Sequence, residues 1–455
     1  MAAVDSKCCH VLLLPYPSQG HVNPMLQFAK RFAAHGLTAT LVATRFILAN
    51  ASPTPGSVRL AAISDGCDRA GFAEADSIPS YLNSFERFGS ATLDDLLRSE
   101  AEAGRPVGLL VFDAFMPWAG EVGRRNNVAT AAFFTQSSAV DLIYYHVKAG
   151  LVQQPVREAL ELPGLPRLQP KDLPSFLPDQ FGVYPAYTEM VFNQFKDLEK
   201  VDEVLINTFY ELEPQETDYL SEVCGAKAIG PTIPSVYLDN RLPFDSRYGF
   251  HLFDVEEAPC MHWLDARPPA STIYVSFGSM VAFGPQQMSE LAYGLADTGK
   301  HFLWVVRTPE LEKLPRGFAE EYCPGRGLIV TWSPQLEVLA HKAVGCFLTH
   351  CGWNSTVEGL SLGVPMVAMP QWTDQPTDAK YVEDVWGVGV RVKEDDEGMV
   401  RREEIVRCVR EVTEGGRSSE IRRNAARWLE LAKAAAGENG SSDKNIMELI
   451  AKYCS

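Results

Sequence analysis

The chain has 455 residues, of which 46% are hydrophobic and 22% charged, and its formal net charge at pH 7 is −17. This length suggests two domains of ordinary size, and the composition is typical of a soluble globular enzyme. The acidic balance argues against binding to nucleic acid or to an anionic membrane, because both need a basic face. It still allows a phosphate ligand, since helix N-termini and neutral donors hold phosphates locally.

The N-terminal segment and the cysteine pattern favour the cytoplasm as the compartment of this protein. The apolar run before Pro15 is too short for the core of a secretory signal peptide, and no stretch approaches 18 consecutive apolar residues. We therefore expect a cytoplasmic protein without membrane insertion. The ten cysteines form no C-x-x-C pair, which argues against a zinc site or a redox motif and favours reduced thiols.

Apolar strands and amphipathic helices alternate along the first half of the chain. In chain order, the sequence predicts a strand at 9–14, a helix at 22–35, strands at 37–43 and 107–113, a helix at 118–126, a strand at 130–134, a helix from 137, a strand at 203–207 and a helix at 213–224. This alternation is typical of a parallel, doubly wound sheet. The proline-rich stretch 162–185 breaks the pattern and predicts irregular loops, such as a lid or an acceptor wall.

A second alternating series begins after residues 229–253, which carry few periodic apolar residues and are typical of an interdomain linker. Its predicted strands are 272–277, 301–306, 328–330, 346–348 and 366–368, and two helices are predicted at 421–436 and 441–453. The predicted fold class is therefore α/β, with two doubly wound parallel-sheet (Rossmann-like) domains.

Residues 332–375 contain the strongest functional signal. An apolar strand at 345–349 leads into His350 and a short turn, and a helix then begins at Asn354. A helix start gathers unpaired backbone N–H groups and the positive end of the helix dipole, so it attracts anions. His350, Asn354 and Ser355 add three side-chain donors at that point. This strand–turn–helix is therefore a candidate diphosphate site.

Two further side chains fit a nucleotide. Glu358 lies four residues after Asn354, on the same helix face, where its carboxylate can accept hydrogen bonds from a sugar diol. Trp332 offers a flat surface on which a base can stack. The alternative is a buried strand–turn–helix of an α/β core without a ligand, but such a unit has no need for this set of polar and aromatic residues.

A second candidate site combines His21 and Asp113. His21 follows the first predicted strand at the start of the first helix, and Asp113 ends the predicted strand 107–113. In a parallel sheet both positions lie at the carboxyl edge, where ligands bind. A helix N-terminus disfavours a charged imidazole, so His21 can act as a general base, and the Asp113 carboxylate can orient it and stabilise the imidazolium. Taken alone, a structural histidine and a strand-end turn residue would be the more common interpretation.

The fixed positions of residues 332–375 resemble a known signature. The stretch is similar to the sugar-nucleotide box of plant family 1 UDP-glycosyltransferases, with Trp-x-Pro-Gln near its start, His-Cys-Gly-Trp-Asn-Ser in the middle, then Glu358, and Asp-Gln at its end. Further similar motifs lie at 17–24, 228–231, 274–279 and 440–442, so the resemblance covers nearly the whole chain.

The resemblance implies the GT-B architecture, in which two Rossmann-like domains face a cleft. For this chain it implies an N-terminal acceptor-binding domain at 1–230, a linker at 231–253, a C-terminal UDP-sugar-binding domain at 254–436, and a C-terminal helix at 437–455 that packs back on the N-terminal domain.

The resemblance also implies the residues that bind the UDP-sugar. They are Gly20, Thr135, Ser279, Trp332, Ser333, Gln335, His350, Gly352, Trp353, Asn354, Ser355, Glu358, Asp374 and Gln375. In this scheme Trp332 stacks on the uracil, Glu358 binds the ribose, the helix start binds the diphosphate, and Asp374 and Gln375 bind the sugar hydroxyls.

The implied reaction is an inverting transfer of glucose from UDP-glucose to a hydroxyl or carboxyl of a small hydrophobic acceptor, such as a plant phenolic, a hormone or a trichothecene-type toxin. His21 takes the position of the family's base and Asp113 that of its partner, and Gln375 resembles the residue of the glucose-using members. No D-x-D or H-E-x-x-H motif is present, so we expect no metal ion. We also expect a monomer.

Other functions remain open. A nucleotide-sugar epimerase of the same fold would act on the sugar itself and would need no base beside a separate acceptor. A non-catalytic UDP-sugar-binding protein would need the donor box without His21 and Asp113. The aromatic and apolar residues that could line an acceptor pocket, or simply pack in the core, are Phe115, Met116, Trp118, Phe181, Tyr184 and Phe192.

Overall fold

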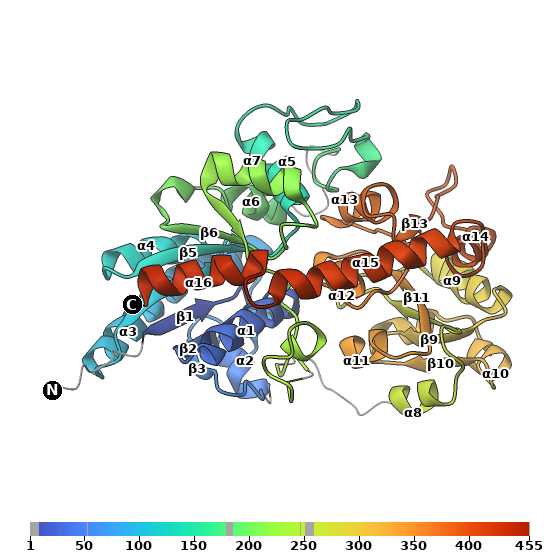
Figure 1. Ribbon diagram of the computed structural model, residues 1–455, viewed down its shortest axis with the longest axis horizontal. Coiled ribbons are helices and arrows are strands. Elements are labelled where there is room, and N and C mark those ends of the chain that lie inside the picture. The colour runs from blue at the N-terminus through green and yellow to red at the C-terminus, as the bar shows by residue number, and fades with distance from the viewer. Residues whose placement is uncertain (1–8, 52, 179–184, 246, 251–258, 455) are drawn as a thin grey trace. The chain divides into compact units, whose positions relative to one another are not determined.

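The computed structural model describes residues 9–51, 53–178, 185–245, 247–250 and 259–454 (Figure 1). The chain divides into two compact units. Unit 1 comprises Met1–Arg167, Asp179–Asp254 and Ala434–Ser455, and unit 2 comprises Leu168–Pro178 and Val255–Lys433.

Among its described residues, unit 1 is built on a seven-stranded parallel sheet in the order β3-β2-β1-β4-β5-β6-β7. The strands are β1 (His10–Leu14), β2 (Thr38–Thr44), β3 (Arg59–Ile63), β4 (Val107–Asp113), β5 (Ala129–Phe134), β6 (Glu203–Ile206) and β7 (Ala226–Ala228). The central strands read as unbroken apolar runs because helices cover both faces of the sheet. The strand order reverses between β1 and β4, and this is the point where ligands bind in such sheets.

The helices of unit 1 are α1 (Gln19–Ala34), α2 (Arg45–Asn50), α3 (Ile78–Glu102), α4 (Pro117–Arg125), α5 (Ser138–Lys148), α6 (Pro185–Asn193), α7 (Pro214–Cys224) and α16 (Ser441–Tyr453). Short 3₁₀ turns occur at Gly71–Glu74, Leu198–Lys200 and Ser235–Tyr237. The last helix, α16, belongs to the same core as the first strand, since Ile446 and Leu449 pack in one cluster with Val11 and Leu13 (Figure 1).

Unit 2 contains a six-stranded parallel sheet, counted over its described residues, in the order β10-β9-β8-β11-β12-β13. The strands are β8 (Thr272–Ser276), β9 (His301–Val305), β10 (Gly327–Val330), β11 (Val344–Thr349), β12 (Met366–Ala368) and β13 (Gly389–Arg391). The helices are α8 (Cys260–Asp265), α9 (Pro285–Asp297), α10 (Phe318–Tyr322), α11 (Gln335–Leu339), α12 (Trp353–Ser361), α13 (Gln375–Lys380), the π-turn Tyr381–Val385, α14 (Arg402–Thr413) and α15 (Ser418–Ala436), which ends in unit 1. The 3₁₀ turns of this unit are Pro170–Asp172 and Thr308–Lys313.

The two parallel sheets confirm the predicted α/β class. The predicted strand 107–113 coincides with β4. The helix α1 begins at Gln19, three residues earlier than predicted, because Ser18, which has an extended backbone, is its N-cap. The strands β3, β7 and β13 and the long helix α3 have no counterpart among the predicted elements.

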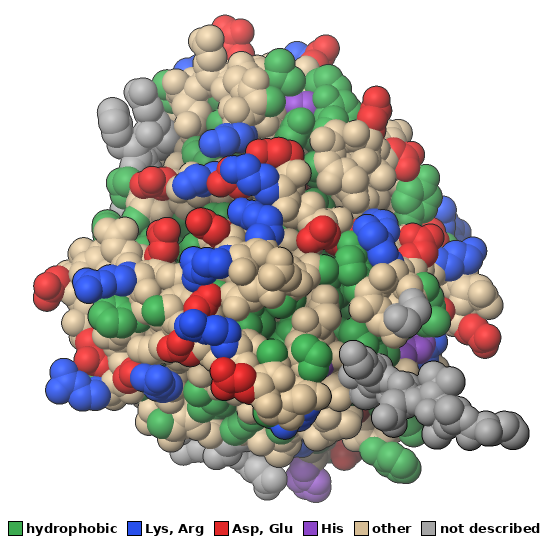
Figure 2. Space-filling view, turned by 90° about the vertical axis from the view of Figure 1, so that its left-hand side faces the viewer, with side chains coloured by type: hydrophobic (Ala, Val, Ile, Leu, Met, Phe, Trp, Pro, Cys, Tyr) green, Lys and Arg blue, Asp and Glu red, His purple; other side chains and the backbone are tan. Residues whose placement is uncertain are grey.

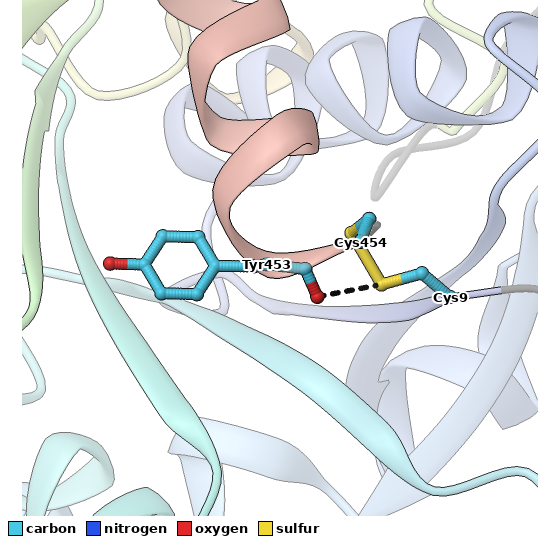
Figure 3. Close-up of a disulfide and its surroundings, with 3 residues drawn as sticks. All are labelled: Cys9, Tyr453 and Cys454. Carbon is cyan, nitrogen blue, oxygen red and sulfur yellow. Dashed lines mark hydrogen bonds between the residues drawn. A yellow bond between two sulfur atoms is a disulfide. The ribbon is translucent and has the colours of Figure 1, made fainter.

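A disulfide between Cys9 and Cys454 joins the start of β1 to the end of α16 (Figure 3). The two Cα atoms are 4.9 Å apart, and Cys9 Sγ also lies 3.5 Å from the carbonyl oxygen of Tyr453. The expectation of reduced thiols is therefore wrong for this pair. Because its members are 445 residues apart, no local cysteine spacing could indicate it. Among the described residues, seven other cysteines are free: Cys67, Cys224, Cys260, Cys323, Cys346, Cys351 and Cys408.

Two surface properties bear on possible partners. On the face drawn in Figure 2, the Lys and Arg side chains of the described residues are interspersed with Asp and Glu and do not gather into one basic patch. The mixed charges of these described residues do not favour a polyanion. None of the helices that the structure describes is long and apolar enough to cross a bilayer.

Candidate functional site

The first candidate site lies at the carboxyl edge of the sheet in unit 1. β1 ends at Leu14 and its neighbour β4 ends at Asp113, on either side of the point where the strand order reverses. Gly20 and His21 lie in the first turn of α1, which follows β1. The structure brings the predicted pair together, with His21 Nδ1 at 2.6 Å from Asp113 Oδ2.

The surroundings of Asp113 fix the proton in this hydrogen bond. The Asp113 side chain is 1% exposed; Oδ1 accepts the Phe115 N–H at 3.1 Å and Oδ2 accepts the Tyr16 N–H at 3.2 Å. Because an ionised carboxylate can only accept, the shared proton belongs to Nδ1 of His21. Thr135 Oγ1 lies 3.3 Å from the same nitrogen. This tautomer leaves Nε2 as the acceptor, as a general base requires.

Aromatic rings flank the His21 imidazole. The ring centroids of Tyr16 and Phe115 lie 5.4 and 4.9 Å from that of His21, and 6.0 Å from each other. Burial raises the pKa of the Tyr16 hydroxyl, and the nearby Tyr187 and Asp113 act in the same direction, so this phenol is neutral at physiological pH. Besides the Asp113 carboxylate, the candidate base is therefore flanked by two uncharged aromatic rings.

The other predicted acceptor-pocket residues divide differently. Met116 is buried in the core, and Trp118 and Phe192 each pack edge to face against another buried aromatic ring. Phe181 and Tyr184 lie outside the described residues. Of the described members of this set, Phe115 is the residue that lies against His21.

The second candidate site lies at the carboxyl edge of the sheet in unit 2. The neighbouring strands β8 and β11 run in parallel, with Ser276 paired to Thr349, and they lead into Gly278 and His350. Gly278 has a φ of +68°, and a Cβ built on it would lie 2.8 Å from His350 Nε2. A Cβ on Gly352 would lie 2.7 Å from the same atom. Both glycines thus make room for the imidazole, and Gly278 also needs glycine for its left-handed backbone.

α12 begins directly after this turn, as predicted for an anion site. Its N-cap is Gly352, which has no side chain to cap the helix. One N–H of the first turn is already used, because the Trp353 backbone donates to the Asp374 carboxylate. Burial lowers the pKa of His350 to about 4. Its ring is therefore neutral at physiological pH and would meet a phosphate as a hydrogen-bond donor and not as a cation.

A hydrogen-bond network connects β8, α11 and α12. The Tyr274 hydroxyl lies 2.9 Å from Ser333 Oγ and donates to Gln335 Oε1 at 3.0 Å. Gln335 Nε2 in turn donates to Ser355 Oγ at 3.0 Å and to Glu358 Oε2 at 2.6 Å. Gln335 was expected to bind the UDP-sugar, but its side chain makes contacts within the protein and orients two other residues of the donor box.

Asp374 and Gln375 lie at the start of α13 and are buried. Burial raises the pKa of the Asp374 carboxyl, while a hydrogen bond from Thr373 opposes this shift. Gln375 Oε1 accepts the backbone N–H groups of Gln371 and Trp372 at 2.9 and 3.1 Å. Because its oxygen is used in this way, Gln375 offers its amide NH₂ to a ligand.

The remaining box residues differ in exposure. Trp332 and Asn354 are partly exposed, so both can meet a ligand. Trp353 is 3% exposed and packs against Trp386 with ring centroids 6.1 Å apart, so it belongs to the core under the site. Ser279 is exposed and follows the left-handed Gly278.

Two residues that support the donor box had no predicted role. Arg307, just after β9, donates through Nη1 to the Ser279 carbonyl at 2.7 Å and through Nη2 to the Val281 carbonyl, and so holds the loop after β8. The position of Arg307 just beyond a strand end, at the same edge of the sheet as the donor box, could have indicated this role. Tyr274 lies inside a strand, and nothing in the sequence distinguishes its hydroxyl from that of a core tyrosine. Among the residues that the structure describes, no group of three or more His, Cys, Asp or Glu could hold a metal ion.

Comparisons with known proteins agree with this geometry. The family described as UDP-glucoronosyl and UDP-glucosyl transferase matches residues 251–417. Crocetin glucosyltransferase 2 of Crocus sativus is 50% identical over 448 residues, which are 98% of this chain and 97% of the relative. The flavonol 7-O-beta-glucosyltransferase of Arabidopsis thaliana is 47% identical over 448 residues, 97% of this chain and 98% of the relative.

Solved structures show the same architecture. The crystal structure of Os79 from O. sativa in complex with UDP has a TM-score of 0.92 and 50% identity, and the match covers 97% of this chain and 100% of that chain. The same protein in complex with U2F and trichothecene has a TM-score of 0.89 and 49% identity over the same shares. The GT-B fold class, with two parallel Rossmann-like sheets, is thereby confirmed.

Proposed function

Because this chain belongs to the plant family 1 UDP-glycosyltransferases, we propose that it transfers glucose from UDP-glucose to a small hydrophobic acceptor, with His21 as the general base. That the chain is a UDP-glycosyltransferase follows from its full-length similarity to the relatives. The identity of the base, the donor sugar and the acceptor are the proposed part. The observation that carries it is the hydrogen bond of 2.6 Å between His21 Nδ1 and Asp113.

Donor binding is assigned to unit 2. The uracil stacks on the partly exposed Trp332, and Glu358, oriented by Gln335, accepts hydrogen bonds from the ribose hydroxyls. The diphosphate lies at the start of α12, against the neutral His350 and the side chains of Asn354 and Ser355. The charge that grows on UDP as it departs is stabilised there by preorganised donors.

The glucose of the donor is assigned to Asp374 and Gln375. A buried carboxylate accepts from sugar hydroxyls, and the amide NH₂ of Gln375 donates to one, so the pair recognises two hydroxyls with opposite polarity. This division of roles supports a hexose with a fixed arrangement of hydroxyls, for which glucose is the proposed choice.

The chemical step is a single displacement. His21 Nε2 takes the proton of the acceptor hydroxyl, the acceptor oxygen forms a bond to the anomeric carbon of glucose, and the bond from that carbon to the UDP oxygen breaks. For a carboxyl acceptor, which is already ionised, no proton needs to be removed. Attack from the face opposite UDP inverts the anomeric configuration, so an α-linked donor gives a β-glucoside. Asp113 holds the tautomer and stabilises the imidazolium that forms.

The acceptor class rests on two independent observations. Tyr16 and Phe115 surround the base with flat apolar surface, which favours an acceptor of low polarity. The relatives act on or bind small organic molecules, namely crocetin, a flavonol and a trichothecene. A plant phenolic, a hormone or a trichothecene-type toxin fits both.

A non-catalytic UDP-sugar-binding protein is the second candidate. It would need the donor box but not the ordered His21 and Asp113 pair. An epimerase of the same fold would likewise need no base that awaits a separate acceptor. The tautomer that leaves His21 Nε2 as a proton acceptor favours a transferase over a binding protein and over an epimerase.

Turnover of UDP-glucose against small phenols, benzoates, terpenoids and a trichothecene tests the proposal, with products detected by mass. Wild type should add one hexose to at least one acceptor, and His21→Ala should lose about 10²–10⁴-fold in rate while binding UDP as well as wild type. UDP binding with neither a glucoside nor hydrolysis of UDP-glucose would contradict the proposed transfer. UDP binding with hydrolysis of UDP-glucose in the control without acceptor, but no glucoside, would mean that the acceptor class is wrong. Loss of UDP binding in His21→Ala would instead assign the residue a structural role.

A further inference from the structure

Thr373, which directly precedes the proposed sugar-binding pair, has an unfavourable backbone conformation. Its φ is +58°, in the left-handed region. A β-branched residue is rare there, and such a conformation costs about 1–3 kcal/mol, so it persists only where surrounding contacts impose it. The contacts that impose it therefore also control the residues that follow.

Those contacts come from a distant part of the chain. The Thr373 N–H donates to Ser175 Oγ at 2.8 Å, and the Ser175 N–H donates to the Thr373 carbonyl at 2.8 Å. Ser175 thus binds both polar groups of the Thr373 backbone. We call these two hydrogen bonds the 175–373 clasp.

The segment that carries Ser175 is itself fastened to unit 2. Residues 168–178 pack in this unit although unit 1 supplies the chain before and after them. The buried Asp172 accepts from Arg391 Nη1 at 3.0 Å, and the Asp172 carbonyl accepts from Thr377 Oγ1 at 2.8 Å. Arg391 Nη2 also donates to the Lys171 carbonyl at 2.8 Å. The segment is therefore a fixed support.

The clasp acts on the sugar-binding residues through Thr373. The Thr373 hydroxyl donates to the Asp374 carboxylate, which also accepts from the Trp353 N–H at the start of α12. Gln375 closes the same turn by accepting from the backbone of Gln371 and Trp372. A change in the Thr373 backbone would rotate its hydroxyl away and move the carboxylate with it.

We propose that Ser175 is a positioning residue for the donor sugar, because its clasp on Thr373 holds Asp374 and Gln375 in their binding geometry. The proposal rests on the proposed function, in that it takes these two residues to bind the hexose. It places a determinant of sugar affinity outside the donor box, in a segment that the sequence predicted to be irregular loop. The side chains assigned to the uridine and the diphosphate lie elsewhere in the sequence, between Trp332 and Glu358.

Binding measurements on the full chain test this without an acceptor. The variants are Ser175→Ala, which removes the hydroxyl, and Ser175→Thr, which keeps one. Ser271→Ala is the matched control, since Ser271 Oγ donates to a backbone carbonyl in an exposed turn before β8, at the opposite edge of the same sheet. Calorimetry gives the Kd of each protein for UDP and for UDP-glucose, and thermal unfolding gives its Tm.

Ser175→Ala should weaken UDP-glucose binding about three- to tenfold, as expected for one lost hydrogen bond, and change UDP binding less than about twofold. Ser175→Thr should restore the UDP-glucose affinity, and Ser271→Ala should leave both affinities unchanged. Equal losses for UDP and UDP-glucose, or no loss for either, would overturn the proposal, whatever happens to the Tm. If Ser175→Ala selectively weakens UDP-glucose binding but wild type forms no glucoside, the proposed transfer fails while the positioning role stands. If wild type binds no UDP, both fall.

Discussion

Replacing Asp113 by asparagine tests how the base is activated. In the structure each Asp113 oxygen accepts a backbone N–H, from Phe115 and Tyr16 at 3.1 and 3.2 Å, and Oδ2 also accepts from His21 at 2.6 Å. Asparagine has one oxygen, so its NH₂ must face at least one of these donors. If the NH₂ faces His21, the imidazole is driven to the tautomer that carries its proton on Nε2, which cannot accept a proton from the acceptor.

The size of the loss follows from the charge that is removed. In the transition state an imidazolium forms beside Asp113, whose side chain is 1% exposed and therefore poorly screened by water. Two unit charges about 4 Å apart at an effective dielectric constant of about 20 interact by about 4 kcal/mol. This energy corresponds to about 10³-fold in rate, which falls within the range of about 10²–10⁴ for general base catalysis.

The assay compares kcat for Asp113→Asn and wild type at saturating UDP-glucose with a hydroxyl acceptor found in the panel, together with the Kd for UDP. Asp65→Asn is the matched control, because Asp65 is also 1% exposed, follows β3 at the same sheet edge and accepts from the Tyr81 hydroxyl at 2.9 Å. We expect a loss of about 10³-fold for Asp113→Asn only, with UDP affinity unchanged. A loss below about tenfold, or equal losses in the two variants, would refute the argument.

Two predictions concern the donor site. Gly278→Ala should weaken UDP binding, measured by calorimetry, more than about tenfold. The added Cβ would lie 2.8 Å from His350 Nε2, and the backbone φ of +68° disfavours alanine. Gly284→Ala is the control and should bind UDP normally, because nothing lies within 4 Å of a Cβ at that position. Burial lowers the pKa of His350 to about 4, so between pH 6.5 and 4 the unfolded chain binds a proton that the folded chain does not, and stability falls as the pH drops through this window. Denaturant titrations should therefore show that the free energy of unfolding falls between pH 7 and pH 5 by about 1–2 kcal/mol less in His350→Asn than in wild type. An equal fall in the two proteins would contradict a lowered pKa for His350.

The features that the sequence predicted correctly depend on local pattern. β4 ends at Asp113 because an apolar run ends there, and a parallel sheet brings the ends of neighbouring strands to one edge. The pairing of His21 with Asp113 could therefore be anticipated from two strand ends and a helix start. The helix that begins at Trp353 is equally a matter of local sequence.

Features that depend on distant contacts were not predictable in this way. Gln335 matches a box position, but its amide turns to Tyr274 and Glu358, and only packing decides between a ligand and a neighbour. The short strand β13 is paired to β12 and has too few residues to show a period. The disulfide and the 175–373 clasp join positions 445 and 198 residues apart, beyond the reach of any spacing rule.

The assembly of unit 2 from two stretches of chain has a consequence for recombination between related enzymes. A hybrid with a single crossover near residue 254 would take Asp172 and Ser175 from one parent and their partners Arg391 and Thr373 from the other. Its donor half would then lack the support with which it evolved, although every residue of the box was inherited together. A chimera meant to exchange sugar preference should carry residues 168–178 along with the C-terminal half, and return to the recipient's own sequence from residue 434, where unit 1 resumes.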